Sequence, residues 1–432
     1  MQTEKQNLRL EGIYPQRQQE FFMQRVKLPA GIISAEQALK VAEVAEQYAR
    51  GLVHLTTRGS IELHWLKEED LVTVARQLAT VGLINRGACG GAVRGVICGS
   101  LSSAAAPALE ALVRKIHRHF SGNPRFEKLP KKFKIGVEAD TASRRHLIQD
   151  IGLIPAPSSD GRARYDVWVA GGLGREPIPG FLLAEAVLED SLLPLIETIL
   201  RLYEANTPAG KRLKHLVRTT GQDEFRRRIL EDPAAAVELP TVPSLTTSMV
   251  PAAVSDAHRL EVGIFAGELK AEGLAALAQI AKDHCGGVLM VTGDQNVVLH
   301  VAGDQDPSGA AGALRAAGFP GDQPKERVIF RVCPGNHECI MGLAPTRDIA
   351  EELVKQMGPK AQQLSWAISG CPNSCAQPQL SEAGIIASRM VNDPAGRTPR
   401  FDLFRRGEAP FSELVEQGLT QFALGEAIKA LG

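Results

Sequence analysis

Four of the seven cysteines lie in two short motifs near the C-terminus, and their spacing limits the chemistry they can do. Cys333 and Cys339 form a C-x5-C pair, and Cys371 and Cys375 form a C-x3-C pair. Each iron at a corner of an iron–sulfur cubane takes one sulfur ligand from the protein, so four thiolates on two loops suit a [4Fe–4S] cluster. Structural zinc sites favour tighter C-x2-C to C-x4-C spacings. The pattern therefore favours a cluster over zinc.

The other three cysteines, Cys89, Cys98 and Cys285, are scattered in apolar segments and are expected to be small core residues. Disulfides are not expected, because the cysteine count is odd and the polar N-terminus has no apolar signal region. No apolar run reaches the roughly 18 residues that would predict a membrane span. We therefore expect a cytoplasmic protein.

Composition gives no support for nucleic acid or a membrane surface as a partner. Lys and Arg together number 49, and so do Asp and Glu, so no overall field favours nucleic acid or a membrane surface. With 432 residues, the chain is too long for one ordinary core. Two or more domains are expected.

The chain contains a tandem repeat. Gly51–His64 can be laid over Gly287–His300 without gaps, and both segments predict two short strands joined by a tight polar turn. A helix is expected before each turn, over about 34–49 and 270–284, and another after it, near 68–81 and 309–316. Ser34 and Gln37 form a capping-box pattern at the start of the first helix. The repeat predicts an α+β half-module that occurs twice.

A second pair of segments repeats in step, because Lys134–Ile154 matches Trp366–Ile386. In this alignment Ala139 and Ser143 stand where the second copy has its C-x3-C cysteines. Only the C-terminal copy keeps a complete thiolate set, so one cluster is expected.

The repeat divides the chain into five parts. They are a half-module at 15–82, a core at 83–231 without cluster ligands, a linker at 232–255, a second half-module at 256–322, and a cluster-binding core at 323–432.

The N-terminal copy carries separated basic residues instead of thiolates. Arg25, Arg58 and Arg94 lie in or beside predicted strands, and Lys132 and Lys134 fall on one face of another. Two ammonium groups on one face repel each other unless an anion lies between them. Taken alone, the pattern also fits a solvated strand edge.

These segments together resemble a known family, the sulfite and nitrite reductase haemoproteins, and most closely its assimilatory-type sulfite reductases. The resemblance extends from about Phe21 to the C-terminus. Its strongest motifs are Leu55-Thr-Thr-Arg-Gly-Ser-Ile-Glu-Leu-His64, Leu129-Pro-Lys-Lys-Phe-Lys134, Gln149-Asp-Ile-Gly-Leu-Ile-Pro155 and Ser369-Gly-Cys-Pro-Asn-Ser-Cys375. It implies an α+β fold in which two half ferredoxin-like modules are each followed by a larger core with a mixed sheet.

The resemblance also assigns roles to residues of this chain. It implies that one [4Fe–4S] cluster is held by Cys333, Cys339, Cys371 and Cys375, and that Cys375 also reaches the iron of one sirohaem. The basic residues around the bound anion would be Arg25, Arg94, Lys132 and Lys134. The sirohaem contacts would be Thr56, Arg58, Lys131, Arg212, Gln295 and Asn296.

Three positions depart from the family pattern. Ala376 stands where the family often has Gly after the last cysteine. His54 and Glu62 replace an Arg and a Gln that commonly line the sirohaem. A carboxylate beside a ring with eight carboxylates is repelled unless it is protonated or paired. We therefore expect ring contacts at Glu62 to differ.

The resemblance implies six-electron reduction of sulfite to sulfide. No C-x2-C run or phosphate-cradling loop suggests a second redox centre, so electrons are expected from a separate donor such as ferredoxin or a reductase subunit. Lys134 favours sulfite over nitrite, since nitrite enzymes tend to carry Asn there. The alternatives are a sirohaem nitrite reductase, a cobalamin-pathway monooxygenase similar to precorrin-3B synthase, and a non-enzymatic carrier.

Overall fold

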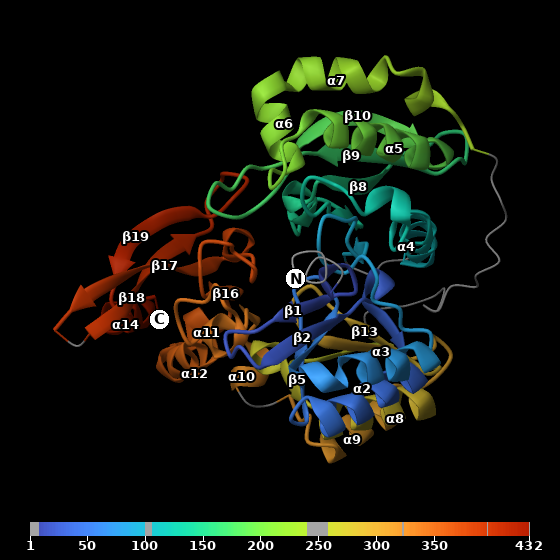
Figure 1. The fold of residues 1–432 in the computed structure, drawn as a ribbon. Helices are drawn as coiled ribbons and strands as arrows, with labels where there is room; N and C mark the ends of the chain where they lie inside the picture. Colours follow the sequence, from blue (N-terminus) through green and yellow to red (C-terminus); the bar gives the residue numbers. More distant parts are fainter. Residues whose placement is uncertain (1–7, 100–105, 240–257, 322–323, 395, 432) are drawn as a thin grey trace.

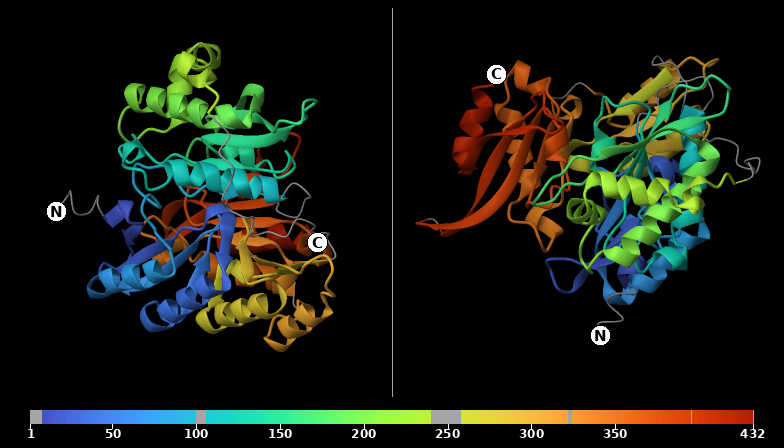
Figure 2. Two further views of the ribbon diagram at one scale, coloured as in Figure 1. Left: turned by 90° about the vertical axis from the view of Figure 1, so that its right-hand side faces the viewer. Right: turned by 90° about the horizontal axis from the view of Figure 1, so that it is seen from above.

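The structure, a computed structural model, describes residues 8–99, 106–239, 258–321, 324–394 and 396–431. In Figure 1 the first core lies above, the second core lies at the left, and the two half-modules lie together below. The views in Figure 2 show the same three bodies, with the second core projecting to one side.

The predicted strand–helix–strand–strand–helix order occurs twice. The first copy consists of β3 (Ile32–Ser34), α2 (Ala35–Tyr48), β4 (Leu52–Leu55), β5 (Ile61–Lys67) and α3 (Leu71–Thr80). The second consists of β12 (Glu268–Lys270), α8 (Ala271–His284), β13 (Val288–Val291), β14 (Val297–His300) and α9 (Ser308–Ala316). Strands β1 (Ile13–Pro15), β2 (Phe21–Val26) and β11 (Arg259–Val262) add to them. The capping box at α2 is confirmed, because the Ser34 and Gln37 side chains each accept the other's backbone N–H at 3.2 Å.

The two half-modules exchange strands. One sheet has the order β1-β2-β5-β4-β12, so β12 of the second copy completes the sheet of the first. The other has the order β11-β14-β13-β3, so β3 of the first copy completes the sheet of the second. Helices α2 and α8 lie side by side under both sheets, and their apolar faces share one core (Figure 1). Neither half can bury its sheet without the other.

The two cores have one topology. The first contains β6 (Ile97–Cys98), α4 (Ala106–Phe120), β7 (Ile135–Val137), β8 (Ile151–Ala156), β9 (Arg164–Val169), β10 (Phe181–Leu188), α5 (Glu189–Asn206), α6 (Leu213–Thr220) and α7 (Gln222–Leu230). The second contains β15 (Phe330–Val332), α11 (Gly335–Glu338), α12 (Thr346–Gln356), α13 (Pro359–Gln362), β16 (Trp366–Ser369), β17 (Ala383–Asp393), β18 (Gly396–Arg405), β19 (Glu413–Leu419) and α14 (Gln421–Lys429). The short α10 (Pro324–Arg327) precedes it.

In each core the first two strand pairings are parallel and the last two are antiparallel. Gly152 and Gly384, which the repeat aligns, make the same close approach to backbone. A Cβ at Gly152 would lie 2.6 Å from the His146 carbonyl oxygen, and one at Gly384 would lie 2.2 Å from that of Pro378. The expected duplicated α+β fold is confirmed.

The expected linker is only partly described. Pro233–Ala236 is a 3-10 helix that packs on α5, and Ala235 within it is buried. The rest of the expected linker lies outside the described residues from 240 onward. Among the described helices, none is long and apolar enough to cross a membrane.

Candidate active site and cluster site

The four motif cysteines lie close together in two loops of the second core. Cys333 follows β15, Cys339 follows α11, and the C-x3-C pair lies in the loop after β16. Both cysteines of that pair interact electrostatically with Cys333 and with Cys339. The Leu343 N–H donates to the Gly370 carbonyl at 2.6 Å and so joins the two loops.

The donor set fits an iron–sulfur cluster. Burial raises the pKa of Cys339 to about 11 and raises that of Cys333 as well, so buried thiolates here need a bound cation to stabilise them. The Gly370 N–H donates to Cys333 Sγ at 3.1 Å, a contact that stabilises a thiolate. In the described part of the chain, no three His, Cys, Asp or Glu side chains are close enough to hold a single ion.

The first half-module holds the Cys375 loop in place. Thr57 Oγ1 donates to the Cys375 carbonyl at 2.8 Å, and Gln377 Nε2 donates to the Thr57 carbonyl at 3.1 Å. Cys375 is the exposed member of the four cysteines. It interacts electrostatically with Lys132 of the first core, so the last cysteine lies toward the basic residues.

The four expected anion-site residues lie together. Arg25 comes from β2, Arg94 from the loop before β6, and the two lysines flank Phe133, which bridges to Val93. Burial lowers the pKa of Lys132 to about 8, with further lowering by Arg94 and Arg25. Burial also lowers the pKa of Lys134, and the ammonium of Lys132 lowers it further.

These cations lack a full set of counter-ions. Neither lysine ammonium has an ion pair among the described residues, and one guanidinium nitrogen of Arg94, Nη1, is buried without a partner. Asp150, fully buried, binds the Lys134 N–H at 2.8 Å and Arg212 Nη2 at 2.8 Å. A cluster of partly buried cations with this surplus of positive charge can hold an inorganic anion.

Two of the expected sirohaem contacts, Thr56 and Arg58, lie in the turn between β4 and β5. Thr56 Oγ1 accepts the N–H groups of Arg58 and Ser60, each at 3.2 Å, and so shapes the turn. Arg58 donates to Gln149 Oε1 at 3.1 Å and to the Gly95 carbonyl at 2.9 Å. Burial lowers the pKa of Arg58 to about 9.

The remaining basic contacts differ from Arg58. Lys131 is exposed, and Arg212 is paired with Asp150. Arg212 Nε and Gln377 Oε1 are nevertheless buried without partners. Buried donors such as Arg58 and Arg212 Nε fit a ligand with several carboxylates, such as sirohaem.

Gln295 and Asn296 are both occupied by protein groups. The Gln295 amide donates to the carbonyls of Leu55 and Val332 at 2.6 and 2.9 Å and accepts the Val332 N–H at 2.6 Å. The Asn296 amide accepts the Ile264 N–H at 3.1 Å and donates to Glu261 at 2.7 Å. Contact of either amide with the ring remains a prediction.

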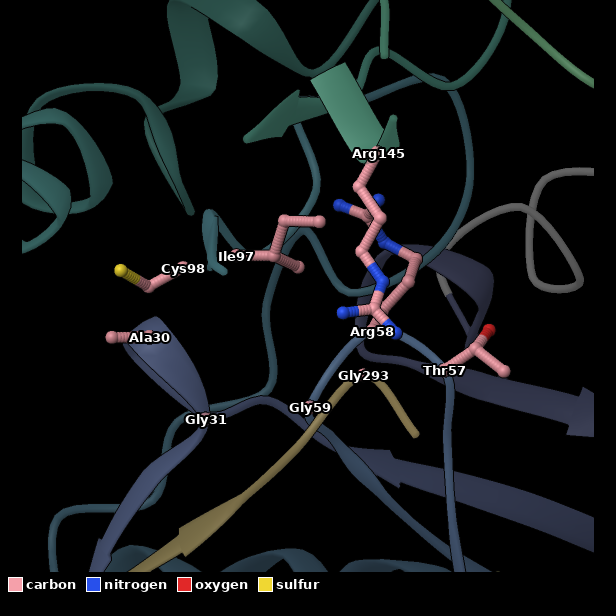
Figure 3. A pocket seen from close by; sticks show the side chains of 9 residues that line it. All are labelled: Ala30, Gly31, Thr57, Arg58, Gly59, Ile97, Cys98, Arg145 and Gly293. Atoms are coloured by element: carbon pink, nitrogen blue, oxygen red, sulfur yellow. The ribbon is translucent and has the colours of Figure 1, made fainter. Parts of the chain in front are cut away.

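A small pocket lies where the first core meets the two half-modules. Its lining residues are Ala30, Gly31, Thr57, Arg58, Gly59, Ile97, Cys98, Arg145 and Gly293. Figure 3 shows the Arg58 and Arg145 side chains next to each other and Cys98 across from them. Arg145 is held by Asp294 at 2.7 Å. Glu138 interacts electrostatically with two of the lining residues, Cys98 and Arg145; burial raises its pKa to about 7, and Ser143 Oγ donates to its carboxyl at 3.1 Å.

Several of these polar residues were not singled out from the sequence. Thr57 and Gln149 stood inside motifs that were noted, but nothing in their spacing indicated their bonds across the fold. Asp150 and Glu138 are charged residues beside apolar strand segments, which is a weak signal of a buried, functional carboxylate. Glu62 is paired with Arg25, and the expected difference in ring contacts at Glu62 remains a prediction.

Comparisons with known proteins identify the family of the chain, and the two matching family models lie outside the segment that holds the four motif cysteines. Residues 93–236 match the family model described as the nitrite and sulphite reductase 4Fe-4S domain. Residues 14–81 and 256–316 match the model of the nitrite/sulfite reductase ferredoxin-like half domain.

Similar proteins include sulfite and nitrite reductases. A sulfite reductase [ferredoxin] of Mycolicibacterium paratuberculosis is 26% identical over 402 residues, which span 86% of this chain and 71% of that protein. A ferredoxin–nitrite reductase of Synechococcus elongatus is 28% identical over 431 residues, 93% of this chain and 83% of that protein. The structure of the Mycobacterium tuberculosis NirA protein has the same fold, with a TM-score of 0.83 and 22% identity over 99% of this chain and 86% of that one.

Proposed function

The chain belongs to the nitrite and sulfite reductase family, and on that premise we propose that it reduces sulfite to sulfide with six electrons from a separate ferredoxin. As a member it is an oxidoreductase whose cofactors are a [4Fe–4S] cluster and sirohaem. The proposal concerns the substrate, the donor and the residues that act on the substrate.

The observation that carries the substrate assignment is the pair Lys132 and Lys134. The two lysines interact electrostatically with each other, Lys132 also interacts with Arg94 and Arg25, and Nη1 of Arg94 is buried without a partner. The sulfite dianion has three oxygens and two charges, whereas nitrite has two oxygens and one charge. Additional buried cations therefore stabilise sulfite more than nitrite.

The lysines also suit proton delivery. When bound, sirohaem supplies the redox chemistry at its iron, with the cluster as its electron source. Each oxygen that leaves sulfite as water must be protonated. Burial brings the pKa of Lys132 down to about 8, which makes its ammonium a proton donor near neutral pH. Lys134 is affected in the same direction by burial and by its neighbour.

The proposed donor is a ferredoxin, as it is in the names of the relatives. Ile340 and Met341 directly follow Cys339, and their side chains are 63% and 50% exposed. Apolar surface next to a cluster ligand suits a small redox partner that docks transiently. Turnover with reduced ferredoxin and none with NADPH alone is the expected result, and NADPH-driven turnover by the isolated chain would contradict it.

The substrate is tested with Lys134→Asn and reduced methyl viologen as donor. Loss of one preorganised cation should remove about 2–4 kcal/mol of transition-state stabilisation for sulfite. That loss corresponds to a roughly 30- to 1000-fold lower kcat/KM for sulfite, and kcat/KM for nitrite should fall less. Lys128→Asn is the matched control, because Lys128 is exposed on the same segment. An unchanged sulfite-to-nitrite ratio would remove Lys134 as the selector. A wild-type enzyme that strongly prefers nitrite would refute sulfite as the proposed substrate.

A further inference from the structure

Arg25 of the anion site faces a carboxylate across the sheet of the first half-module. In the pairing of β2 with β5, Arg25 lies directly opposite Glu62. Arg25 Nε donates to Glu62 Oε1 at 3.1 Å, and Nη2 bonds to the same oxygen. Only 8% of the Glu62 side chain is exposed. Because the sheet register places the two residues together, the pair is a fixed feature of the site.

Among the neighbours of Glu62, Arg25 is the cation that pairs with its carboxylate. His54 lies opposite Glu62 on β4, and Glu268 lies opposite His54 on β12. Burial lowers the pKa of His54 to about 3, so this imidazole is neutral near pH 7. His64 Nε2 lies 3.4 Å from Glu62 Oε2.

Glu62 itself is ionised. Burial alone would raise the pKa of Glu62, but the charge of Arg25, together with the nearby His64, holds it well below its usual value. A full negative charge therefore lies beside one of the four anion-site cations.

We propose that Glu62 is a specificity-determining residue that cancels the charge of Arg25 and so limits the preference of the site for doubly over singly charged anions. The inference rests on the proposed function, because it concerns the same anion site. A fixed negative charge destabilises a bound dianion twice as much as a monoanion at the same position. Arg25 then orients the anion by hydrogen bonds, while Lys132, Lys134 and Arg94 supply the net charge.

The test removes the charge and keeps the shape. Glu62→Gln retains an oxygen that can accept from Arg25. For an assumed separation on the order of 10 Å and an effective dielectric constant near 20, the interaction of Glu62 with one extra charge on the anion changes the relative affinity for the two anions roughly tenfold. The ratio of kcat/KM for sulfite to that for nitrite should therefore rise about tenfold. The sulfite Kd, measured by optical titration of the oxidised holoenzyme, should fall relative to the nitrite Kd by a similar factor.

Reversal of the effect separates charge from structure. Arg25→Gln leaves Glu62 unbalanced, so the sulfite-to-nitrite ratio should fall below that of the wild type. Combining both substitutions restores the original net charge, so the ratio should return toward the wild-type value although both activities are lower. Glu36→Gln, an exposed carboxylate on α2, should change nothing.

The result that overturns the inference is a ratio that stays within twofold of wild type in either single variant, or a double variant whose ratio does not return. Because Arg25→Gln is an independent measurement, the inference stays testable even if Glu62→Gln loses its cofactors. A wild type that prefers nitrite would overturn the proposed function, but the direction of each shift would still test the role of Glu62.

Discussion

Replacing Gln295 by Leu should loosen the second core, because its side chain closes the open edge of that core's sheet. β15 is an edge strand, with β16 on one side only. On the other side, the Gln295 amide accepts the Val332 N–H and donates to the Val332 carbonyl, as a neighbouring peptide group would. The same amide donates to Leu55, and Gln295 is 1% exposed.

The size of the effect follows from the groups left unpaired. Leu leaves one buried N–H and two carbonyls without this partner, and each such loss costs about 1–3 kcal/mol. The larger apolar surface of Leu offsets part of it, so a net loss of about 3–5 kcal/mol is expected. At about 2 °C per kcal/mol for a large chain, the unfolding midpoint should fall by roughly 5–10 °C.

The assay follows heat unfolding by circular dichroism and cluster loss by visible absorbance in the same sample. The cluster should be released earlier, since Val332 directly precedes Cys333. Gln305→Leu is the control, because Gln305 is exposed on the same half-module. A midpoint within about 1 °C of wild type would refute the edge-closing role. Sirohaem loss without any fall in the midpoint would instead support the ring contact predicted from the sequence.

Two further predictions concern the cluster and a buried acid. Cys375→Ser should lower iron and acid-labile sulfide below the roughly four of each expected per chain and uncouple the two redox centres, whereas Cys285→Ser should do neither; equal iron in both variants would contradict the assignment. Since burial raises the pKa of Glu138 from 4.5 unfolded to about 7 folded, the folded state binds the extra proton and stability falls as pH rises from about 4.5 to 7. Glu138→Gln should therefore gain up to about 3 kcal/mol over wild type at pH 8 and little at pH 5, and equal gains at both pH values in urea unfolding would contradict the buried acid.

Local features of this protein could be predicted from sequence because they depend on neighbouring residues. The capping box at Ser34, the two strand-turn-strand segments and the helices around them follow from short-range hydrogen bonds and apolar spacing. The duplication followed from self-similarity, and the paired cysteine motifs pointed to a cluster because ligand chemistry restricts residue type and spacing.

Some of the site could be expected for a similar reason. The lysine pair taken alone also fits a solvated strand edge, and its role at an anion came from the family resemblance and stays a prediction. The structure shows that Lys132 interacts electrostatically with Lys134, Arg94 and Arg25, as the two-residue period of extended backbone allows for the two lysines.

The pairings between distant segments were decided only by the tertiary structure. Three contacts join segments that are far apart in the sequence. They are the exchange of β3 and β12 between the half-modules, the hydrogen bond from Thr57 to Cys375, and the hydrogen bonds between Gln295 and Val332. Strand order and register follow from packing of the whole apolar core, and a one-residue shift in register would turn Glu62 away from Arg25. The sequence by itself determined which groups were available for binding and catalysis. The assembled sheets determined which of the charged groups are paired with each other and which are not.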